Sequence, residues 1–274
     1  MASAESGINR VGFTGLGSHG CPMALNLVRA GFEVMVWDSR PEAVRALEQA
    51  GARVGASLEE VGGFGDFIGV CEVADPDWDE ADVEEVAAGL IAGARPGAIL
   101  AFHAAIYPST VRRIAERAET RSMHVVDAQV NGGEGRARSA TLSFMLGGDR
   151  QLLERCQPVF DACGSSATYM GPLGAGAAAK VAHYLLVCAN LVTVAEVMRL
   201  VESEGVDLPG FQTLVHESLG QSEVSDQWLK AFRPMPNDRA EHLYRRGGYA
   251  LGMAAELGLS LPAAGLVHQL MRTL

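Results

Sequence analysis

The sequence predicts an α/β domain with a parallel sheet, followed by an all-α domain, the two joined by a long interdomain helix. Short β-branched runs alternate with amphipathic segments through the first half of the chain, as in successive strand–helix units of a parallel sheet. A turn-rich segment at residues 171–176, Gly-Pro-Leu-Gly-Ala-Gly, interrupts this alternation, and only helical patterns follow it. We therefore expect two domains, residues 1–171 and 172–274.

The first domain is expected to hold strands separated by helices. Runs of strand-forming residues bounded by turn residues predict strands at 10–14, 33–37, 66–71, 98–102, 124–127, 141–146 and 167–170. Helices are predicted at residues 21–30, 41–50 and 109–118. Pro41 suits the first turn of its helix, and the acidic segment 75–85 favours the N-terminus of another.

The second domain is predicted to begin with one long apolar helix. Residues 177–203 contain neither glycine nor proline, so nothing in this segment breaks a helix. Further helices are expected at residues 208–219, 225–232, 239–257 and 262–274. A long hydrophobic helix needs covering on more than one side, which favours a homo-oligomer.

The charge balance limits the classes of partner. The chain has 274 residues, of which 48% are hydrophobic and 20% charged, so it can bury a sizeable core. Lysine and arginine total 22 against 33 acidic residues, giving a formal net charge of −11. A protein that binds nucleic acid or an anionic membrane needs a positively charged surface. Neither is therefore expected as a partner of this acidic chain.

We expect a cytoplasmic protein. The apolar stretch 181–201 contains Glu196 and Arg199, so it is not expected to cross a membrane, and the N-terminus has no signal-peptide pattern. The five cysteines are widely spaced and contain no C-x-x-C pair, which is typical of reduced thiols. No metal site is expected.

A glycine-rich turn follows the first expected strand. Gly15-Leu-Gly-Ser-His-Gly20 has the spacing G-x-G-x-x-G and leads directly into a helix. In such a turn the first glycine permits the bend, the second lets the backbone approach a pyrophosphate, and the third lets helix and strand pack closely. The helix N-terminus then offers N–H groups to the phosphates. The motif predicts a Rossmann-like dinucleotide-binding site, the alternative being a purely structural turn.

Asp38 ends the second expected strand. An acid at this position accepts hydrogen bonds from the adenosine ribose hydroxyls, which favours NAD over NADP. The alternative is that Asp38 only caps the next helix. Arg40, two residues later, could instead meet a 2′-phosphate, so NAD and NADP both stay open, with NAD favoured.

Three motifs in order resemble those of the β-hydroxyacid dehydrogenases. The segment Gly15-Leu-Gly-Ser-His-Gly-Cys-Pro-Met-Ala-Leu-Asn-Leu27 resembles that family's opening G-L-G-x-M-G-x-x-M-A-x-N-L. Asp127-Ala-Gln-Val-Asn-Gly-Gly133 resembles its substrate loop D-A-P-V-S-G-G, and Gly174-Ala-Gly-Ala-Ala-Ala-Lys180 its catalytic G-x-G-x-x-x-K. The resemblance implies an active site in the interdomain cleft and a homodimer or homotetramer.

The resemblance also implies that Lys180 is the catalytic general acid/base, giving a proton to the substrate oxygen as hydride moves between nicotinamide and carbonyl carbon. Desolvation can lower the pKa of such a lysine towards neutrality. Lys180 is the only charged residue between Asp161 and Glu196. The alternative is a helix lysine that points to solvent.

The remaining candidate residues divide into two groups. Those expected to bind the cofactor, NAD or NADP, are Gly15, Leu16, Gly17, Ser18, His19, Gly20, Asp38, Ser39, Arg40, Cys71, Glu72, Val73 and His103. Those expected to bind a small-molecule substrate are Asn131, Gly132, Gly133, His183, Tyr184, Arg245 and Arg246.

Several positions depart from the family pattern. Tyr184 stands where the family has a substrate-binding asparagine, and Ala104 or Ala105 stands where it has a serine or threonine. Asn131 replaces the serine of the substrate loop, which keeps a hydrogen-bonding side chain. These changes bear on the substrate more than on the class of reaction.

Other departures leave two interpretations each. Arg245 and Arg246 replace a K-D-L motif, and they could grip a carboxylate or phosphate or could be surface charges. His183 shares a helix face with Lys180, and it could reshape the pocket or pack between domains. His19 could touch the pyrophosphate or serve the packing of its loop.

The leading hypothesis is an NAD(P)-dependent dehydrogenase that acts on a small hydroxy acid. A second hypothesis keeps the chemistry and changes the substrate to an imine, a phosphonate or a bulkier carbonyl compound. Imine reductases of similar architecture usually lack the lysine, which weighs against that branch. A third hypothesis is a dinucleotide-binding protein without turnover.

Overall fold

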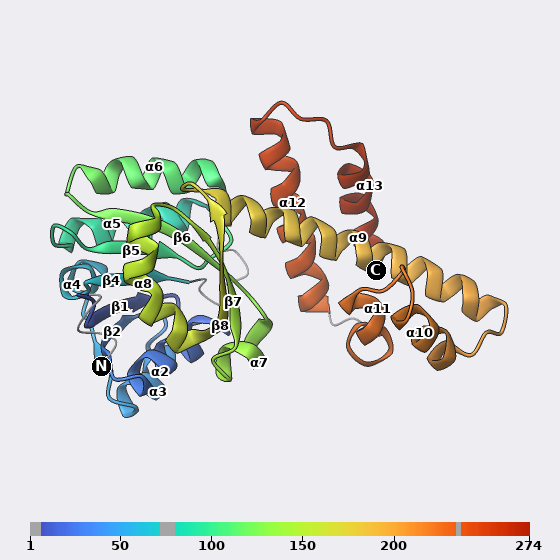
Figure 1. The fold of residues 1–274 in the computed structure, drawn as a ribbon, viewed down its shortest axis with the longest axis horizontal. Coiled ribbons are helices and arrows are strands. Elements are labelled where there is room, and N and C mark those ends of the chain that lie inside the picture. The colour runs from blue at the N-terminus through green and yellow to red at the C-terminus, as the bar shows by residue number, and fades with distance from the viewer. Residues whose placement is uncertain (1–6, 72–79, 234–236) are drawn as a thin grey trace. The chain divides into compact units, whose positions relative to one another are not determined.

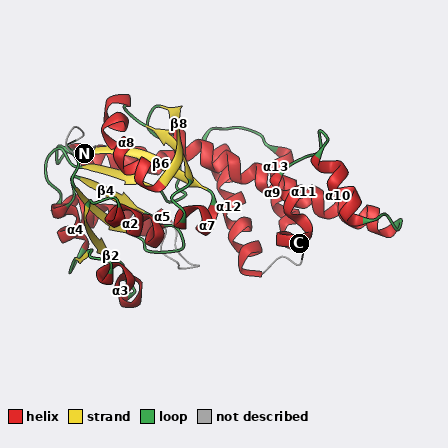
Figure 2. Cartoon of the chain, turned by 60° about the horizontal axis from the view of Figure 1, so that its bottom comes forward, coloured by secondary structure: helices red, strands yellow, loops and turns green. Residues whose placement is uncertain are grey.

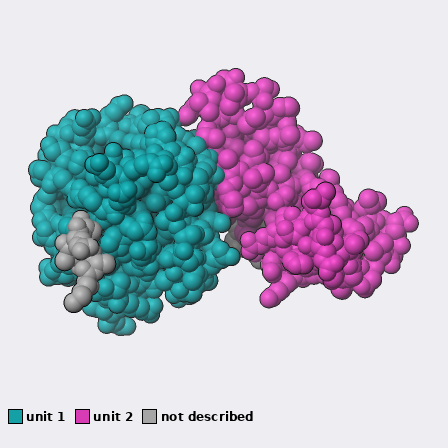
Figure 3. Space-filling view, in the orientation of Figure 1, with its two compact units in different colours: residues 1–180 teal, residues 181–274 magenta. Residues whose placement is uncertain are grey.

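The computed structural model describes residues 7–71, 80–233 and 237–274. The chain forms two compact units, residues 1–180 and 181–274 (Figure 3). The predicted boundary at residue 171 lies at the end of the last strand, and the helix after it starts in the first unit and continues into the second.

The first unit is built on one eight-stranded sheet, in the order β3-β2-β1-β4-β5-β6-β7-β8. Its strands are yellow and the helices beside them red in Figure 2. All neighbours are parallel except β6 and β7, which are antiparallel. The strands are β1 (Arg10–Thr14), β2 (Glu33–Trp37), β3 (Arg53–Val54), β4 (Phe67–Val70), β5 (Ile99–Phe102), β6 (His124–Asn131), β7 (Leu142–Gly147) and β8 (Gly164–Gly171).

Seven helices accompany this sheet in the described part of the first unit (Figure 1). They are α2 (Gly20–Arg29), α3 (Pro41–Gln49), α4 (Leu58–Phe64), α5 (Glu80–Gly93), α6 (Pro108–Glu119), α7 (Gly133–Arg138) and α8 (Arg150–Cys163). Because side chains alternate along a strand, the sheet supplies two apolar clusters, one packed with α2 and α8 and one with α4, α5 and α6.

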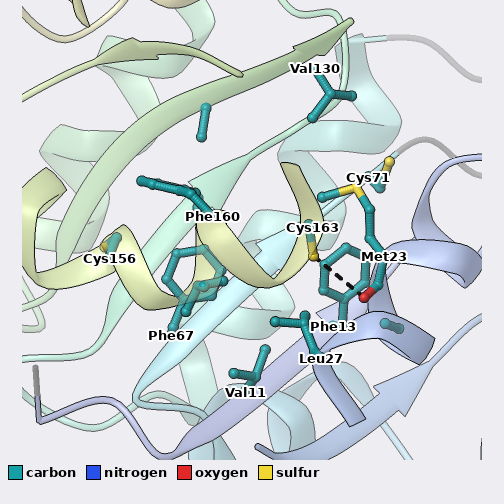
Figure 4. Close-up of a cluster of buried hydrophobic side chains, with 14 of the residues drawn as sticks. Val11, Phe13, Met23, Leu27, Phe67, Cys71, Val130, Cys156, Phe160 and Cys163 are labelled. Atoms are coloured by element: carbon teal, nitrogen blue, oxygen red, sulfur yellow. Dashed lines mark hydrogen bonds between the residues drawn. The ribbon is translucent and has the colours of Figure 1, made fainter. Parts of the chain in front are cut away.

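The cluster beside α2 and α8 contains Phe67, Phe144 and Phe160, of which Figure 4 labels Phe67 and Phe160. The rings of Phe67 and Phe160 meet edge to face at 6.3 Å between centroids, and those of Phe144 and Phe160 lie 5.1 Å apart. The thiol of Cys163 donates to the backbone oxygen of Met23 at 3.5 Å, which ties α8 to α2. These contacts join the sheet to α8 and α8 to α2.

The predicted strands are all present, and some helices were not anticipated. The structure adds β3, α4, α7 and α8 to the predicted elements. Helices α4 and α7 are short and contain glycine, and α8 has Pro158 inside it. The sequence pattern that predicts a helix is therefore weak in all three segments. The expected parallel sheet is interrupted only at the β6–β7 pair. The predicted acidic segment 75–85 lies partly outside the described residues.

The second unit is helical, as predicted. Its elements are α9 (Ala175–Ser203), α10 (Leu208–His216), α11 (Glu223–Gln227), a π-helical turn (η1, Trp228–Phe232), α12 (Asn237–Glu256), α13 (Pro262–Leu270) and a 3₁₀ turn (η2, Met271–Thr273). A third apolar cluster holds them together, with Leu191 and Met198 of α9 packed against Trp228, Leu243 and Met271. Asp207 and Ser222 cap α10 and α11.

Helix α9 is the one described helix that is long and apolar enough to cross a membrane by length and composition. Its apolar window is 28% buried within the chain. Leu186 and Leu200 are 64% and 65% exposed, so part of its apolar surface is left uncovered by the residues that the structure describes. All five cysteines are free thiols.

Candidate active site

The glycine turn after β1 brings backbone segments closer than side chains would allow. Gly15 has a φ of +79°, and a Cβ placed there would stand 1.9 Å from the carbonyl oxygen of Cys71. A Cβ on Gly20 would stand 1.9 Å from the carbonyl oxygen of Gly15. Helix α2 begins at Gly20 with no side-chain cap and no acidic residue in its first turn. This cradle fits the pyrophosphate of a dinucleotide.

Asp38 and Arg40 form a closed pair at the end of β2. The side chain of Asp38 has no exposed surface. Its Oδ2 accepts a 2.7 Å hydrogen bond from the backbone N–H of Leu16, and its Oδ1 accepts from the backbone N–H and the Nε of Arg40, both at 3.0 Å. The carboxylate therefore links the glycine turn to the end of β2 and holds the Arg40 guanidinium beside it.

His103 follows β5 directly and lies in the core. The residue is 4% exposed, and its ring stacks on Phe13 with 5.8 Å between centroids. Its Nδ1 is 2.7 Å from the carbonyl oxygen of Ala128. Ala104 and Ala105 beside it are also buried. The side chain of His103 thus serves packing in this structure, and its predicted contact with a cofactor stays a prediction. Of the neighbouring predicted residues, Cys71 is buried, and Glu72 and Val73 lie outside the described residues.

We expect His103 to make stability depend on pH. Burial lowers the pKa of His103 to about 4 from its ordinary 6.5, so between these values the unfolded chain binds a proton that the folded chain does not. The free energy of unfolding should fall by about 3 kcal/mol as the pH drops through this window. His103→Asn removes the titrating group and should flatten that dependence, measured by urea unfolding from pH 7 to 4. Equal slopes in wild type and His103→Asn would contradict the assignment.

Lys180 lies in the first two turns of α9 and points inward. It is 7% exposed, and its Nζ donates a 2.8 Å hydrogen bond to the carbonyl oxygen of Val130 in β6. Asn131, the next residue, ends β6 and is partly exposed. Gly132 and Gly133 follow with φ values of +138° and +69°, which glycine adopts without strain. The structure therefore brings the lysine to the start of the predicted substrate loop.

Two buried polar residues of β6 were not assigned a role by sequence reasoning. Asp127 is fully buried and accepts hydrogen bonds from backbone N–H groups at the start of α9. Gln129 is also fully buried, and its Nε2 donates to the carbonyl oxygen of Phe102 at 3.1 Å. The available signal was the polar residue at every second position of an otherwise apolar strand.

Comparison with known proteins decides the family. The model described as the NAD binding domain of 6-phosphogluconate dehydrogenase matches residues 10–171. The model described as NAD-binding of NADP-dependent 3-hydroxyisobutyrate dehydrogenase matches residues 174–274. NAD-dependent L-serine dehydrogenase of Pseudomonas aeruginosa is 33% identical over 260 residues, which cover 94% of this chain and 86% of that protein. The chain belongs to the β-hydroxyacid dehydrogenase family.

Two further matches cover nearly all of this dehydrogenase. Mitochondrial 3-hydroxyisobutyrate dehydrogenase of Mus musculus is 29% identical over 272 residues, covering 96% of this chain and 81% of that protein. The structure of Mycobacterium tuberculosis 3-hydroxyisobutyrate dehydrogenase with L-serine superposes with a TM-score of 0.84 at 25% identity, covering 97% and 93% of the two chains. The dehydrogenase is thus an NAD(P)-dependent oxidoreductase that acts on the CH–OH group of a hydroxy acid.

The other predicted substrate residues of the dehydrogenase belong to its second unit. His183 and Tyr184 lie one turn beyond Lys180 on α9, and the ring of Tyr184 packs against His242 of α12 at 6.3 Å between centroids. Tyr184 therefore belongs to the apolar cluster of that unit. A role of these two side chains in a substrate pocket stays a prediction.

The two neighbouring arginines of α12 lie in different environments. Arg245 is on the surface, where its Nε pairs with Glu241 at 3.0 Å, one turn earlier. Arg246 is 8% exposed, and its guanidinium lies 5.5 Å from the centre of the Tyr249 ring. Since consecutive helix residues point about 100° apart, one oxyanion would not easily meet both. That Arg245 and Arg246 together bind an anionic group of the substrate stays a prediction.

Proposed function

We propose that the dehydrogenase oxidises a small 3-hydroxy acid with Lys180 as the general acid/base. The observation that supports this role is the buried Lys180 Nζ on the Val130 carbonyl, directly before Asn131, Gly132 and Gly133. A hydroxyl group presented at the end of β6 would meet an amine that is fixed by its hydrogen bond and largely withdrawn from water.

The chemistry needs one hydride acceptor and one proton acceptor. A nicotinamide dinucleotide bound at the glycine turn would take the hydride from the carbon that bears the hydroxyl. Lys180, in its neutral form, takes the proton of the hydroxyl group as the C–H bond breaks. In the reverse direction the protonated amine returns a proton to the carbonyl oxygen. A positioned acid or base of this kind contributes about 10²–10⁴ in rate.

The substrate loop supports a carboxylate-bearing substrate. Asn131 keeps an amide that can donate to a carboxylate oxygen, and the glycines after it let backbone N–H groups approach the same ligand. Two relatives are named for L-serine and 3-hydroxyisobutyrate, which are both small 3-hydroxy acids.

A substrate panel tests this proposal. The purified protein is assayed with L-serine, 3-hydroxyisobutyrate and further 3-hydroxy acids in one direction, and with aldehydes, phosphonate-bearing carbonyl compounds and cyclic imines in the other. The proposal expects turnover of a 3-hydroxy acid above that of every imine. Turnover of imines or phosphonates alone would favour the hypothesis that the substrate is an imine, a phosphonate or a bulkier carbonyl compound. Cofactor binding without turnover of any compound would favour a non-catalytic dinucleotide-binding protein.

NAD is the cofactor we propose. Asp38 has a buried carboxylate at the end of β2, where we propose that the adenosine ribose binds, and a 2′-phosphate would bring two further negative charges towards it. Arg40 is held by that same carboxylate, so less of its charge is available to a phosphate.

We expect NADH to bind at least about tenfold more tightly than NADPH, equal to about 1.4 kcal/mol. Fluorescence titration with each cofactor measures this ratio. Arg40→Ala should leave the weak binding of NADPH nearly unchanged, because the guanidinium is paired with Asp38. A preference for NADPH that Arg40→Ala removes would contradict the proposal and assign Arg40 to the 2′-phosphate.

A second copy of this chain is the partner we propose for the exposed face of α9. Leu186, Val197 and Leu200 fall on one face of the helix and are 64%, 36% and 65% exposed. The net charge of −11 opposes an anionic membrane as the cover. Light scattering at micromolar concentration should give a dimer or larger, and a monomer, or binding to anionic vesicles, would contradict this.

A further inference from the structure

Strand β6 contacts the start of α9 at two points. Asp127 Oδ1 accepts a hydrogen bond from the backbone N–H of Gly174 at 2.8 Å, and its Oδ2 accepts one from the N–H of Ala177 at 2.7 Å. Three residues further along the strand, the carbonyl oxygen of Val130 accepts from Lys180 Nζ. The carboxylate thus caps the helix that bears Lys180, from the same strand that receives the lysine.

The space for this carboxylate exists because two neighbouring residues have no side chain. A Cβ on Gly176 would stand 2.7 Å from Asp127 Oδ2, and a Cβ on Gly147 would stand 2.4 Å from Oδ1. Gly174 has a φ of +95°, which side-chain-bearing residues rarely adopt. Within the segment Gly174-Ala-Gly-Ala-Ala-Ala-Lys180, Gly176 therefore leaves room for the carboxylate, and Gly174 adopts the backbone conformation in which its N–H reaches Oδ1.

The electrostatic setting favours a rigid contact. Burial raises the pKa of Asp127, and the backbone N–H groups of Gly174 and Ala177 act in the opposite direction. The positive end of the α9 dipole stabilises a carboxylate at this position. Asp127 is 0% exposed, so water cannot readily replace either hydrogen bond.

We propose that Asp127 is a positioning residue for the reaction. By fixing the first turn of α9 on β6, its carboxylate sets where Lys180 lies, because Ala177 and Lys180 are three residues apart and share a helix face. The amine is then held at the Val130 carbonyl, beside the substrate loop. This proposal rests on the proposed role of Lys180, and Asp127 acts through the backbone N–H groups of Gly174 and Ala177.

The test uses the full chain and a matched control. Asp127→Asn keeps the size of the side chain but leaves an NH₂ group facing one of the two N–H donors, so one hydrogen bond is lost. Asp149→Asn is the control, because Asp149 caps α8 by accepting from the N–H groups of Gln151 and Leu152, and α8 holds no candidate site residue. Asp127→Ser, a smaller capping residue, is a second variant.

The sequence offers a direct probe of the lysine, since its only lysines are Lys180 and Lys230. Protein grown with [ε-¹³C]lysine gives two lysine signals in an NMR spectrum, assigned with Lys230→Arg. In Asp127→Asn we expect the Lys180 signal to shift and the Lys230 signal to stay. We also expect kcat to fall by at least about tenfold, since a displacement of about 1 Å can cost on the order of 10² in rate. KM and the Kd for NADH should stay within about twofold.

The outcomes are distinct. Asp149→Asn should keep the wild-type kcat and both lysine signals. A folded Asp127→Asn or Asp127→Ser with wild-type kcat and an unmoved Lys180 signal would overturn the proposal. If both Asp127 variants fail to fold while Asp149→Asn folds, the carboxylate serves stability alone and the proposal is likewise overturned. If Lys180→Ala retains turnover, the proposed function fails, yet the NMR comparison still reports whether Asp127 fixes the lysine.

Discussion

Replacing Lys180 with alanine should lower kcat by about 10²–10⁴, the usual contribution of a general acid/base. Binding of NADH should persist, because the glycine turn, Asp38 and Arg40 are untouched by the change. Steady-state kinetics on the best substrate of the panel and fluorescence titration with NADH measure the two quantities separately. A small primary amine added to Lys180→Ala should restore part of the lost rate.

The second lysine of the chain provides the control for this experiment. Lys230 lies in the π-helical turn of the second unit, which holds no candidate site residue. Lys230→Ala should therefore keep the wild-type kcat. A Lys180→Ala enzyme that retains more than about a third of the wild-type kcat would assign the proton transfer to another group, since a loss of about threefold is far below the range for such a residue.

Replacing Gly15 with alanine should abolish cofactor binding and strongly destabilise the first unit. The added Cβ would stand 1.9 Å from the carbonyl oxygen of Cys71, so the turn and the end of β4 must move apart. The positive φ of +79° adds strain of about 1–2 kcal/mol. Thermal unfolding and titration with NADH measure the two effects.

Gly31 is the matched control for Gly15. Its φ is +91°, but a Cβ placed there meets nothing within 4 Å. Gly31→Ala therefore adds only backbone strain. Its Tm should fall by roughly 2–4 °C for each kcal/mol of lost free energy of unfolding. Equal Tm values for Gly15→Ala and Gly31→Ala, with NADH binding retained in both, would show that close approach at the turn is not required.

Much of the fold was predictable because local patterns determine it. The strands of a buried parallel sheet are short apolar runs, and the glycine turn after β1 has a fixed spacing that follows from its phosphate-binding geometry. Helix α8 was missed because Pro158 interrupts its pattern, and α7 because its six residues include two glycines. The direction of β7 relative to β6 depends on tertiary contacts that no local pattern reports.

The candidate site was predictable in part for a similar reason. Lys180 stands out as a charge in an apolar helix, so its burial could be anticipated. Asp127 did not stand out, because its partners are backbone N–H groups of residues some fifty positions away, and backbone groups leave no trace in sequence. The burial of His103 was equally hidden, since the three phenylalanines around it come from separate strands.

The alternation of β6 has a consequence for insertions and deletions. Val126, Ala128 and Val130 face the apolar cluster beside α2 and α8, and Asp127 faces the opposite side of the sheet. One residue added or removed between Asp127 and Val130 would exchange the two faces of the strand on one side of the change. The carboxylate of Asp127 would then point at the apolar cluster. Active homologues should therefore differ in the lengths of their loops but keep the number of residues in β6, even where the side chains of this strand differ.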